Sequence, residues 1–372
     1  MRYRRFGKTN LAISVFSLGT MRCLATPKVA EQTVQRALEL GINHLETARG
    51  YGASEQFLGM ALGQLAGARE QIYLTTKIAP TTDAATMNRY IDESLQRLQV
   101  DYLDCLALHG LNTWEHLAQV EAGCGAAVQQ AVADGRVRHV GFSTHGSLDL
   151  IQAAIATDRF AFVNLHYSVF FQRHAPALDL AHHKDLGVFI ISPADKAGLL
   201  HTPPATLIDL CAPLSPLAVN YRWLLSDSRI TTLSVGPAHA QELDLPLADH
   251  DGVLTPTEAA IVQRLHDQQQ HVLATEQCRQ CYACLPCPVD IQIPEVLRLR
   301  NLAIAYDMTR FGEYRYRMFE NAGHWFPGAK AHRCNDCGDC LPRCPEQLDI
   351  PTLLRDTHDR LNGKPGRRLW AE

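Results

Sequence analysis

Eight of the chain's twelve cysteines fall into two short runs near its C-terminal end. Two residues separate successive cysteines throughout the first run. The second run has gaps of two, two and three residues, and a proline follows the last cysteine of each run. Three cysteines spaced CxxCxxC can wrap one face of an iron–sulfur cubane, and the second run has the full spacing of a [4Fe–4S] ligand run. The two runs are Cys278, Cys281, Cys284, Cys287 and Cys334, Cys337, Cys340, Cys344.

Two zinc sites are the alternative interpretation of these cysteines. Zinc sites usually pair two CxxC units across a longer spacer, whereas each run here is continuous, so the spacing favours iron–sulfur. Similar sequences, PVDIQIP and PEQLDIP, follow the two runs and indicate two related halves of one domain. Residues 293–320, between the runs, have a helical pattern rich in arginine and aromatic residues. This stretch predicts either a helix with inward aromatics and solvated arginines, or a docking surface for an acidic redox partner.

A second group of reactive side chains lies in the first third of the chain, where Glu46, Tyr51, Lys77 and His109 follow or end β-rich runs. A tyrosine beside a lysine and a histidine can transfer protons. The ammonium favours tyrosinate and should lower the pKa of the tyrosine, and a carboxylate keeps the lysine charged and positioned. Any one of the four could be an ordinary polar group, but their places at consecutive strand ends favour a catalytic set.

The elements that would position this set alternate along the chain. Several of the β-rich runs are almost continuously apolar, as parallel strands covered by helices are. Eight β-then-α units predict an α/β fold, a (β/α)8 TIM barrel. A doubly wound sheet is the alternative, but it would usually carry GxGxxG after its first strand, and here Gly19 is followed by Thr-Met-Arg-Cys. The predicted strands are 15–20, 44–48, 72–78, 102–109, 137–144, 160–168, 187–193 and 230–236.

Helix signals lie between the predicted strands. Apolar residues recur at helical spacing in 83–100, and Asp83 is placed to cap that helix. Residues 28–40 form a second such stretch, with Gly41 where a C-terminal cap glycine belongs. Ser147 opens a helix over 148–156, and a further helix runs from Thr255 to about Leu273. We therefore predict a barrel domain over 1–250, a helical linker over 251–275 and a small α-helical ferredoxin-like domain over 276–372.

Composition bounds the class of protein. The 372 residues, 46% of them hydrophobic, can bury a substantial core. The net charge of −4 gives no reason to expect a nucleic-acid partner. No apolar h-region follows the basic N-terminus, so no secretory signal is visible, and no run of 18 apolar residues predicts a transmembrane helix. Clustered cysteines without a signal favour metal binding in a reducing, cytoplasmic compartment, and the scattered cysteines Cys23, Cys105, Cys124 and Cys211 are expected to be buried free thiols.

Several segments resemble the aldo-keto reductase family. The stretches LETARGYGASEQFLG, LTTKI and LALHG are similar to its strand-2, strand-3 and strand-4 segments, and YRRFGKTNLAISVFSLGTM, GFST, NLHYS, WLLSD and SVGP match other landmarks between about residues 2 and 245. The resemblance implies reduction of a small-molecule carbonyl with a nicotinamide cofactor, usually NADPH. It makes Tyr51 the general acid, Lys77 its tuning group, His109 the substrate-orienting group and Glu46 the carboxylate.

The same resemblance assigns nucleotide-binding residues. Ser143, Thr144 and Asn164 fall where the family holds the nicotinamide carboxamide, and Gly236 begins its phosphate-binding loop. The chain departs from the family where Glu46 replaces an aspartate, Thr144 an asparagine and Ile191 a stacking tyrosine, and Pro246 stands near a common asparagine. The stretch PAHAQELDLP after Gly236 lacks the Lys or Arg that would pair a 2′-phosphate. NADPH and NADH both remain candidates.

The cysteine region resembles two-cluster ferredoxins, in which the fourth cysteine of a run ligates the other cluster. That resemblance implies two [4Fe–4S] clusters, one held by Cys278, Cys281, Cys284 and Cys344 and one by Cys334, Cys337, Cys340 and Cys287. The whole chain resembles the aldo-keto reductase subgroup with a C-terminal 4Fe–4S dicluster domain. A cluster passes one electron and a nicotinamide passes a hydride. The clusters could therefore relay electrons between a redox partner protein and the barrel. Alternatively, the chain is an electron-transfer or assembly subunit with a degenerate nicotinamide site, or the clusters only staple the domain.

Overall fold

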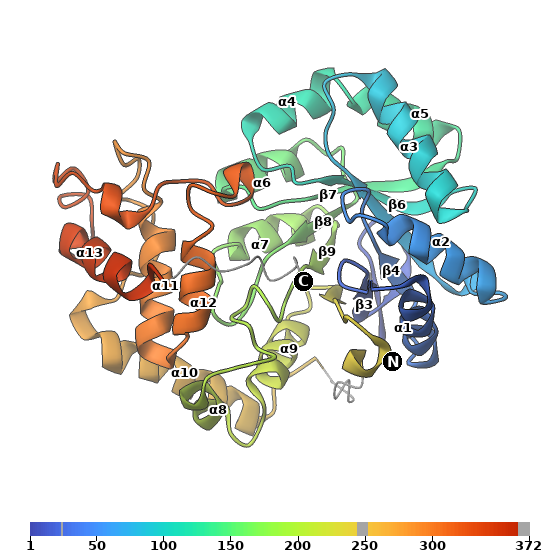
Figure 1. The fold of residues 1–372 in the computed structure, drawn as a ribbon. Coiled ribbons are helices and arrows are strands. Elements are labelled where there is room, and N and C mark those ends of the chain that lie inside the picture. Colours follow the sequence, from blue (N-terminus) through green and yellow to red (C-terminus); the bar gives the residue numbers. More distant parts are fainter. Residues whose placement is uncertain (24, 244–251, 364–372) are drawn as a thin grey trace. The chain divides into compact units, whose positions relative to one another are not determined.

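The computed structural model describes residues 1–23, 25–243 and 252–363. Two compact units are present, one comprising Met1–Lys196 and Tyr221–Val253 and the other Ala197–Asn220 and the chain from Leu254. Figure 1 shows the strands of the first unit and the helices of the second. Within the described part of the chain, no helix combines the length and apolarity that a membrane span requires.

Eight parallel strands close into a barrel in the first unit, in the order β10-β3-β4-β5-β6-β7-β8-β9. Each strand lies inside one of the eight predicted ranges, so the predicted (β/α)8 barrel is confirmed. The strands are β3 (Phe16–Gly19), β4 (His44–Glu46), β5 (Tyr73–Ile78), β6 (Leu103–His109), β7 (Val137–Ser143), β8 (Phe162–Leu165), β9 (Gly187–Ile190) and β10 (Thr232–Val235). The helices that alternate with them are α1 (Pro27–Glu39), α2 (Ser54–Gln64), α3 (Ala84–Leu98), α4 (Trp114–Ala122), α5 (Gly125–Ala133), α6 (Leu148–Ala156), α7 (Ala175–His183) and α9 (Pro216–Ser226).

Local signals explain where these helices begin and end. The Asp83 side chain accepts from the backbone N–H of Thr86 at 2.7 Å, and the Ser147 hydroxyl accepts from Leu150 N, so both predicted N-caps are present. Gly41 follows the last residues of α1 with a φ of +79°, a conformation that suits glycine at a helix C-terminus. These local signals therefore fix where α3 and α6 begin and where α1 ends.

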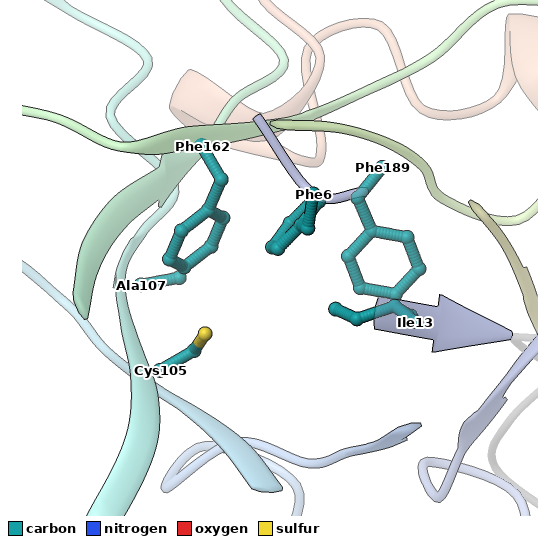
Figure 2. Close-up of a cluster of buried hydrophobic side chains, with 6 residues drawn as sticks. All are labelled: Phe6, Ile13, Cys105, Ala107, Phe162 and Phe189. Atoms are coloured by element: carbon teal, nitrogen blue, oxygen red, sulfur yellow. The ribbon is translucent and has the colours of Figure 1, made fainter. Parts of the chain in front are cut away.

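An N-terminal hairpin supplies part of the barrel core. Strands β1 (Tyr3–Arg5) and β2 (Ala12–Ser14) pair antiparallel, and Phe6 between them packs among barrel side chains (Figure 2). Its ring lies 5.2 Å from that of Phe162, the first residue of β8. Gly187, the first residue of β9, leaves room for Phe6, because a Cβ there would come within 2.1 Å of the ring. This cluster therefore packs Phe6 of the hairpin against the first residues of β8 and β9. Its members are Phe6, Ile13, Cys105, Ala107, Phe162 and Phe189.

The second unit is helical in its described part. Its helices are α8 (Ala205–Cys211), α10 (Pro256–Leu273), α11 (Ile293–Tyr306), α12 (Thr309–Tyr316) and α13 (Ile350–Leu361). The predicted helix near 255–273 is confirmed, and Thr255 and Glu258 form a capping box at its start. The predicted helical stretch 293–320 is two helices, because Asp307 adopts a left-handed φ of 55° between them.

The arginines of this stretch are not generally solvated as one expectation had it. Arg298, Arg300 and Arg315 are buried, and α11 is buried on almost every side. Arg300 pairs with Glu276 and, at 2.6 Å, with Asp356, while the Arg315 guanidinium lies 4.3 Å from the ring centre of Phe326. Burying a guanidinium is tolerated only with such partners, so removing Glu276 and Asp356 would leave the Arg300 charge buried and unpaired.

Candidate active site and cysteine-rich centre

Glu46 and Lys77 form a buried ion pair at the C-terminal end of the barrel strands. Glu46 ends β4 and Lys77 is the fifth residue of β5, and both side chains are almost fully buried. The Lys77 ammonium contacts Glu46 Oε1 directly and donates to the Thr47 carbonyl at 3.0 Å. Glu46 also accepts from the Ser234 hydroxyl at 3.4 Å. The carboxylate that is one methylene longer than the expected aspartate therefore still reaches the lysine.

Tyr51 and His109 complete the cluster above this pair. The Lys77 Nζ atom lies 4.8 Å from the centre of the Tyr51 ring. The His109 ring meets Tyr51 edge-on, with centroids 5.5 Å apart and planes at 87°. All four residues predicted to be catalytic thus lie together at one mouth of the barrel. In a barrel of this kind that mouth, at the C-terminal strand ends, is where active sites are found.

The electrostatics of the cluster differ from the expectation of an acidified tyrosine. Burial raises the pKa of Tyr51 above its usual value, because desolvation disfavours the phenolate. Burial also lowers the pKa of Lys77, and the charge of Lys196 lowers it further. The resting phenol therefore holds its proton firmly, and any stabilisation of tyrosinate by Lys77 matters only when that proton leaves.

The residues expected to hold a nicotinamide carboxamide lie on adjacent strand ends, since Ser143 pairs with Asn164 across β7 and β8. Both side-chain polar atoms of Asn164 are buried without a hydrogen-bond partner. A buried amide in that state calls for a ligand that both donates and accepts, as a carboxamide does. The Thr144 hydroxyl, expected in the same role, donates to Leu111 O at 2.7 Å and accepts from Gly146 N at 2.9 Å.

The loop after β10 contains a pairing that the sequence did not reveal. Arg22, which follows β3, donates to the Gly236 carbonyl at 2.9 Å and pairs with Glu242 at 3.1 Å. The Ala238 N–H donates to the same Glu242 carboxylate at 2.9 Å. A cation thus lies beside the expected phosphate loop, already held by a carboxylate. Only its place just past a strand end could have signalled it. Pro246, near a common family asparagine, lies outside the described residues.

The two cysteine runs share several left-handed backbone positions. Gln280 and Asp336 share a left-handed φ, as do Tyr282 and Gly338, and as do Asp290 and Gln347. Each run is followed by a helix that begins with Ile-Pro, at Ile293 in α11 and at Ile350 in α13. The sequence similarity of the two halves therefore extends to their loops. A non-glycine residue in this conformation costs about 1 kcal/mol, and Tyr282 is held in it by a hydrogen bond to Glu295.

The fourth cysteine of each run approaches the other run. Cys287 lines one pocket with Cys334, Cys337 and Cys340. Burial raises the pKa of Cys278 to about 11, and both Cys281 and Cys344 are close enough to add to that shift. Burial likewise raises the pKa of Cys340, with Cys334, Cys337 and Cys287 adding to it. The donor sets fit the crossed arrangement expected from two-cluster ferredoxins.

The thiol spacing also bears on the zinc alternative. A tetrahedral zinc site brings thiolates to within about 4 Å of one another, given Zn–S bonds of about 2.3 Å. Among the residues that the structure describes, no three His, Cys, Asp or Glu side chains gather as one metal ion requires. The scattered cysteines Cys23, Cys105, Cys124 and Cys211 are buried free thiols, as predicted.

The barrel and its polar mouth define a class of oxidoreductases, and sequence comparison agrees. The profile of the aldo/keto reductase family matches residues 16–211, more than half of the chain. The chain belongs to the aldo/keto reductase family. A second profile, the 4Fe-4S dicluster domain, matches residues 277–349, so this oxidoreductase also carries a domain of the iron–sulfur type.

Relatives are similar to the chain in sequence, and a solved structure shares its fold. The chain is 25% identical to an uncharacterized oxidoreductase, YrpG, of Bacillus subtilis over 297 residues, 65% of this chain and 89% of the relative. It is 32% identical to the 6-dehydroglucose reductase of Novosphingobium aromaticivorans over 158 residues, 38% of this chain and 51% of the relative. The fold matches aldo-keto reductase AKR11C1 from Bacillus halodurans with a TM-score of 0.62, at 23% identity and covering 71% of this chain and 96% of that one.

Proposed function

We propose that the barrel reduces the carbonyl group of a small molecule with NADH or NADPH. The observation that carries this proposal is the buried Glu46–Lys77 pair beneath Tyr51, with His109 against the same ring. A relative named 6-dehydroglucose reductase and another named methylglyoxal reductase, from Escherichia coli O157:H7, support a small carbonyl substrate. The unpartnered amide of Asn164 supports a carboxamide-bearing cofactor.

Each residue of the cluster has a role in the proton transfer. A nicotinamide held by Ser143 and Asn164 would supply a hydride to the carbonyl carbon. Tyr51 gives its proton to the carbonyl oxygen as negative charge develops there. His109 orients that oxygen, and Lys77 stabilises the tyrosinate left behind. Glu46 keeps Lys77 in place, because an ammonium buried to this degree needs a counter-charge.

The C-terminal unit is proposed to hold two [4Fe–4S] clusters on its eight clustered cysteines, for electron transfer. Such clusters would supply one-electron carriers, exchanging electrons with a redox partner protein. Cysteine thiolates in these runs remain available for ligation only where thiols stay reduced, so the cytoplasm is the proposed compartment. Neither a membrane nor a nucleic acid is a proposed partner of the protein.

A second candidate is an electron-transfer or assembly subunit whose nucleotide site is degenerate. The observation that favours it is the set of contacts made by Glu242. This carboxylate pairs with Arg22 and accepts from the Ala238 N–H beside the proposed phosphate loop. A cofactor phosphate placed there would meet a carboxylate. Under this alternative the clusters would function while the barrel bound no nicotinamide.

Anaerobic purification followed by nucleotide titration separates the two candidates. NADH and NADPH are titrated against the full-length protein by fluorescence, and the clusters are followed in parallel by EPR. Binding of either nucleotide, with turnover of a test aldehyde that Tyr51→Phe abolishes, supports the reductase. Intact clusters without binding of either nucleotide would leave the subunit as the better description. Unchanged turnover in Tyr51→Phe would remove Tyr51 as the acid.

A further inference from the structure

Three basic side chains meet beyond the ends of β7, β8 and β9. His145 follows Ser143 by two residues, His166 comes directly after β8, and Lys196 follows β9. The Nε2 atoms of the two imidazoles are 3.3 Å apart. The Lys196 Nζ atom lies 3.3 Å from His145 Nε2 and 3.2 Å from His166 Nε2. Three nitrogens therefore surround one point, and all three side chains are only partly buried, so a small ligand can reach them.

The tautomer of His166 follows from its other contact. Its Nδ1 atom lies 3.2 Å from the Ile191 carbonyl, which can only accept. The hydrogen is thus on Nδ1, and Nε2 of the neutral ring presents a lone pair. Lys196 donates to that lone pair. While its ring is neutral, His166 Nε2 is therefore an acceptor for Lys196, and it becomes a donor when the ring is protonated.

We propose that His145, His166 and Lys196 form an oxyanion-binding site for a phosphate or carboxylate group. An oxyanion accepts charge-assisted hydrogen bonds from an ammonium and from a protonated imidazole, and it accepts them more strongly than a neutral imidazole does. With an anion present, Lys196 would donate to it instead of to His166 Nε2, and the anion would favour protonation of that nitrogen. A metal ion suits the site less well, since the Lys196 ammonium lies within 3.3 Å of both imidazoles.

The position of the trio relates it to the catalytic cluster. His145 and His166 extend the strands that carry Ser143 and Asn164, and Lys196 contributes to the lowered pKa of Lys77, after the larger effect of burial. An oxyanion bound there would therefore lie at the same barrel mouth. It could belong to the cofactor's diphosphate or to an acidic group on the carbonyl substrate, both of which rest on the proposed function.

Calorimetric titration of the full-length protein with inorganic phosphate at low ionic strength tests the site without requiring turnover. Lys196→Met should weaken phosphate binding by about tenfold or more, because a hydrogen bond to a charged group is lost. Lys196→Arg should retain it. Lys184→Met is the matched control, since Lys184 pairs with Asp158 at 2.7 Å and belongs to α7 and its C-terminal cap, away from the trio. Equal phosphate affinity in the wild type and Lys196→Met would overturn the proposal, whatever the enzyme reduces.

Two further measurements on the same variants identify the source of the oxyanion. If the cofactor supplies it, Lys196→Met weakens NADH binding and leaves the ratio of KM for 4-oxobutanoate to KM for butanal unchanged. If the substrate supplies it, NADH binding is unchanged and that ratio rises about tenfold or more. Either result supports the site. A loss of phosphate binding in Lys184→Met as large as in Lys196→Met would contradict it.

Discussion

The phenol of Tyr51 depends on a charged pair below it and an imidazole beside it. Its raised pKa keeps the proton in place at rest, so the pair acts on the tyrosinate formed during transfer. Tyr51→Phe should lower kcat by about 10²- to 10⁴-fold, the usual contribution of a positioned acid. The measurement is aldehyde reduction followed by NADH absorbance. Tyr3→Phe is the control, because the exposed Tyr3 hydroxyl only donates to the Gly41 carbonyl.

Glu242 sets the charge beside the proposed phosphate loop. It neutralises Arg22, so a 2′-phosphate would gain no free cation and would face a carboxylate. Glu242→Gln should therefore improve NADPH affinity relative to NADH by about tenfold, as one charge-assisted contact becomes available. Fluorescence titration with both nucleotides measures this ratio. Glu39→Gln, which removes a surface partner of Arg36 on α1, should leave it unchanged.

At the scale of elements, the N-terminal hairpin packs against β9 because Gly187 has no side chain to obstruct Phe6. Gly187→Ala would drive a methyl group to within 2.1 Å of Phe6. Overpacking of this kind costs about 1–3 kcal/mol, so the free energy of unfolding in urea should fall by that amount. Gly63→Ala, at an exposed position inside α2, should instead raise it by about 0.5–1 kcal/mol, because alanine favours the helix. A loss of stability in both variants would point away from the Phe6 contact.

The cysteine runs act as a pair of elements, and their proposed crossing has a clear test. Combining Cys287→Ser with Cys340→Ser removes two ligands of the same cluster if the runs cross. The purified double variant should then keep about half of the wild-type iron, and its remaining signal should match one cluster by EPR. If each run holds its own cluster, the same variant loses a ligand from both clusters and its iron falls close to zero.

Much of the barrel could be predicted because its signals are local. Strand runs, the caps at Asp83 and Ser147, and the catalytic set all follow from neighbouring residues and from strand order. The division of residues 293–320 into two helices at Asp307 and the burial of Arg300 could not be predicted from neighbouring residues. A left-handed turn at an aspartate has no distinctive pattern, and Arg300 is buried because Glu276 and Asp356, distant in sequence, meet it.

Contacts between residues distant in sequence also limited the prediction of the candidate site. The sequence predicted Thr144 as a cofactor ligand but did not reveal that its hydroxyl also bonds to the backbone of neighbouring loops. It did not identify Arg22, whose role depends on Glu242 some 220 residues away in the chain. The trio of His145, His166 and Lys196 was also missed, because three loops that are separate in sequence bring these residues together.

At the scale of the whole molecule, the division into two compact units predicts two unfolding events. Removing the proposed clusters with an oxidant and a chelator should destabilise the cysteine-bearing unit, since bound metal contributes directly to folding. The barrel should keep its own core around Phe6. Scanning calorimetry should therefore show one transition shifted down and one nearly unchanged, with NADH binding retained. A single transition that shifts as a whole would mean that the units unfold together.

The exchange of fourth cysteines between the two runs also constrains how the protein is made. During synthesis, Cys278, Cys281 and Cys284 leave the ribosome well before Cys344, with α11 and α12 in between. Under the crossed arrangement, the early run lacks its last ligand until Cys344 has been synthesised. Cluster insertion would then have to follow synthesis of both runs, and a nascent chain truncated between the runs could present the four thiols of the first run but could close neither centre.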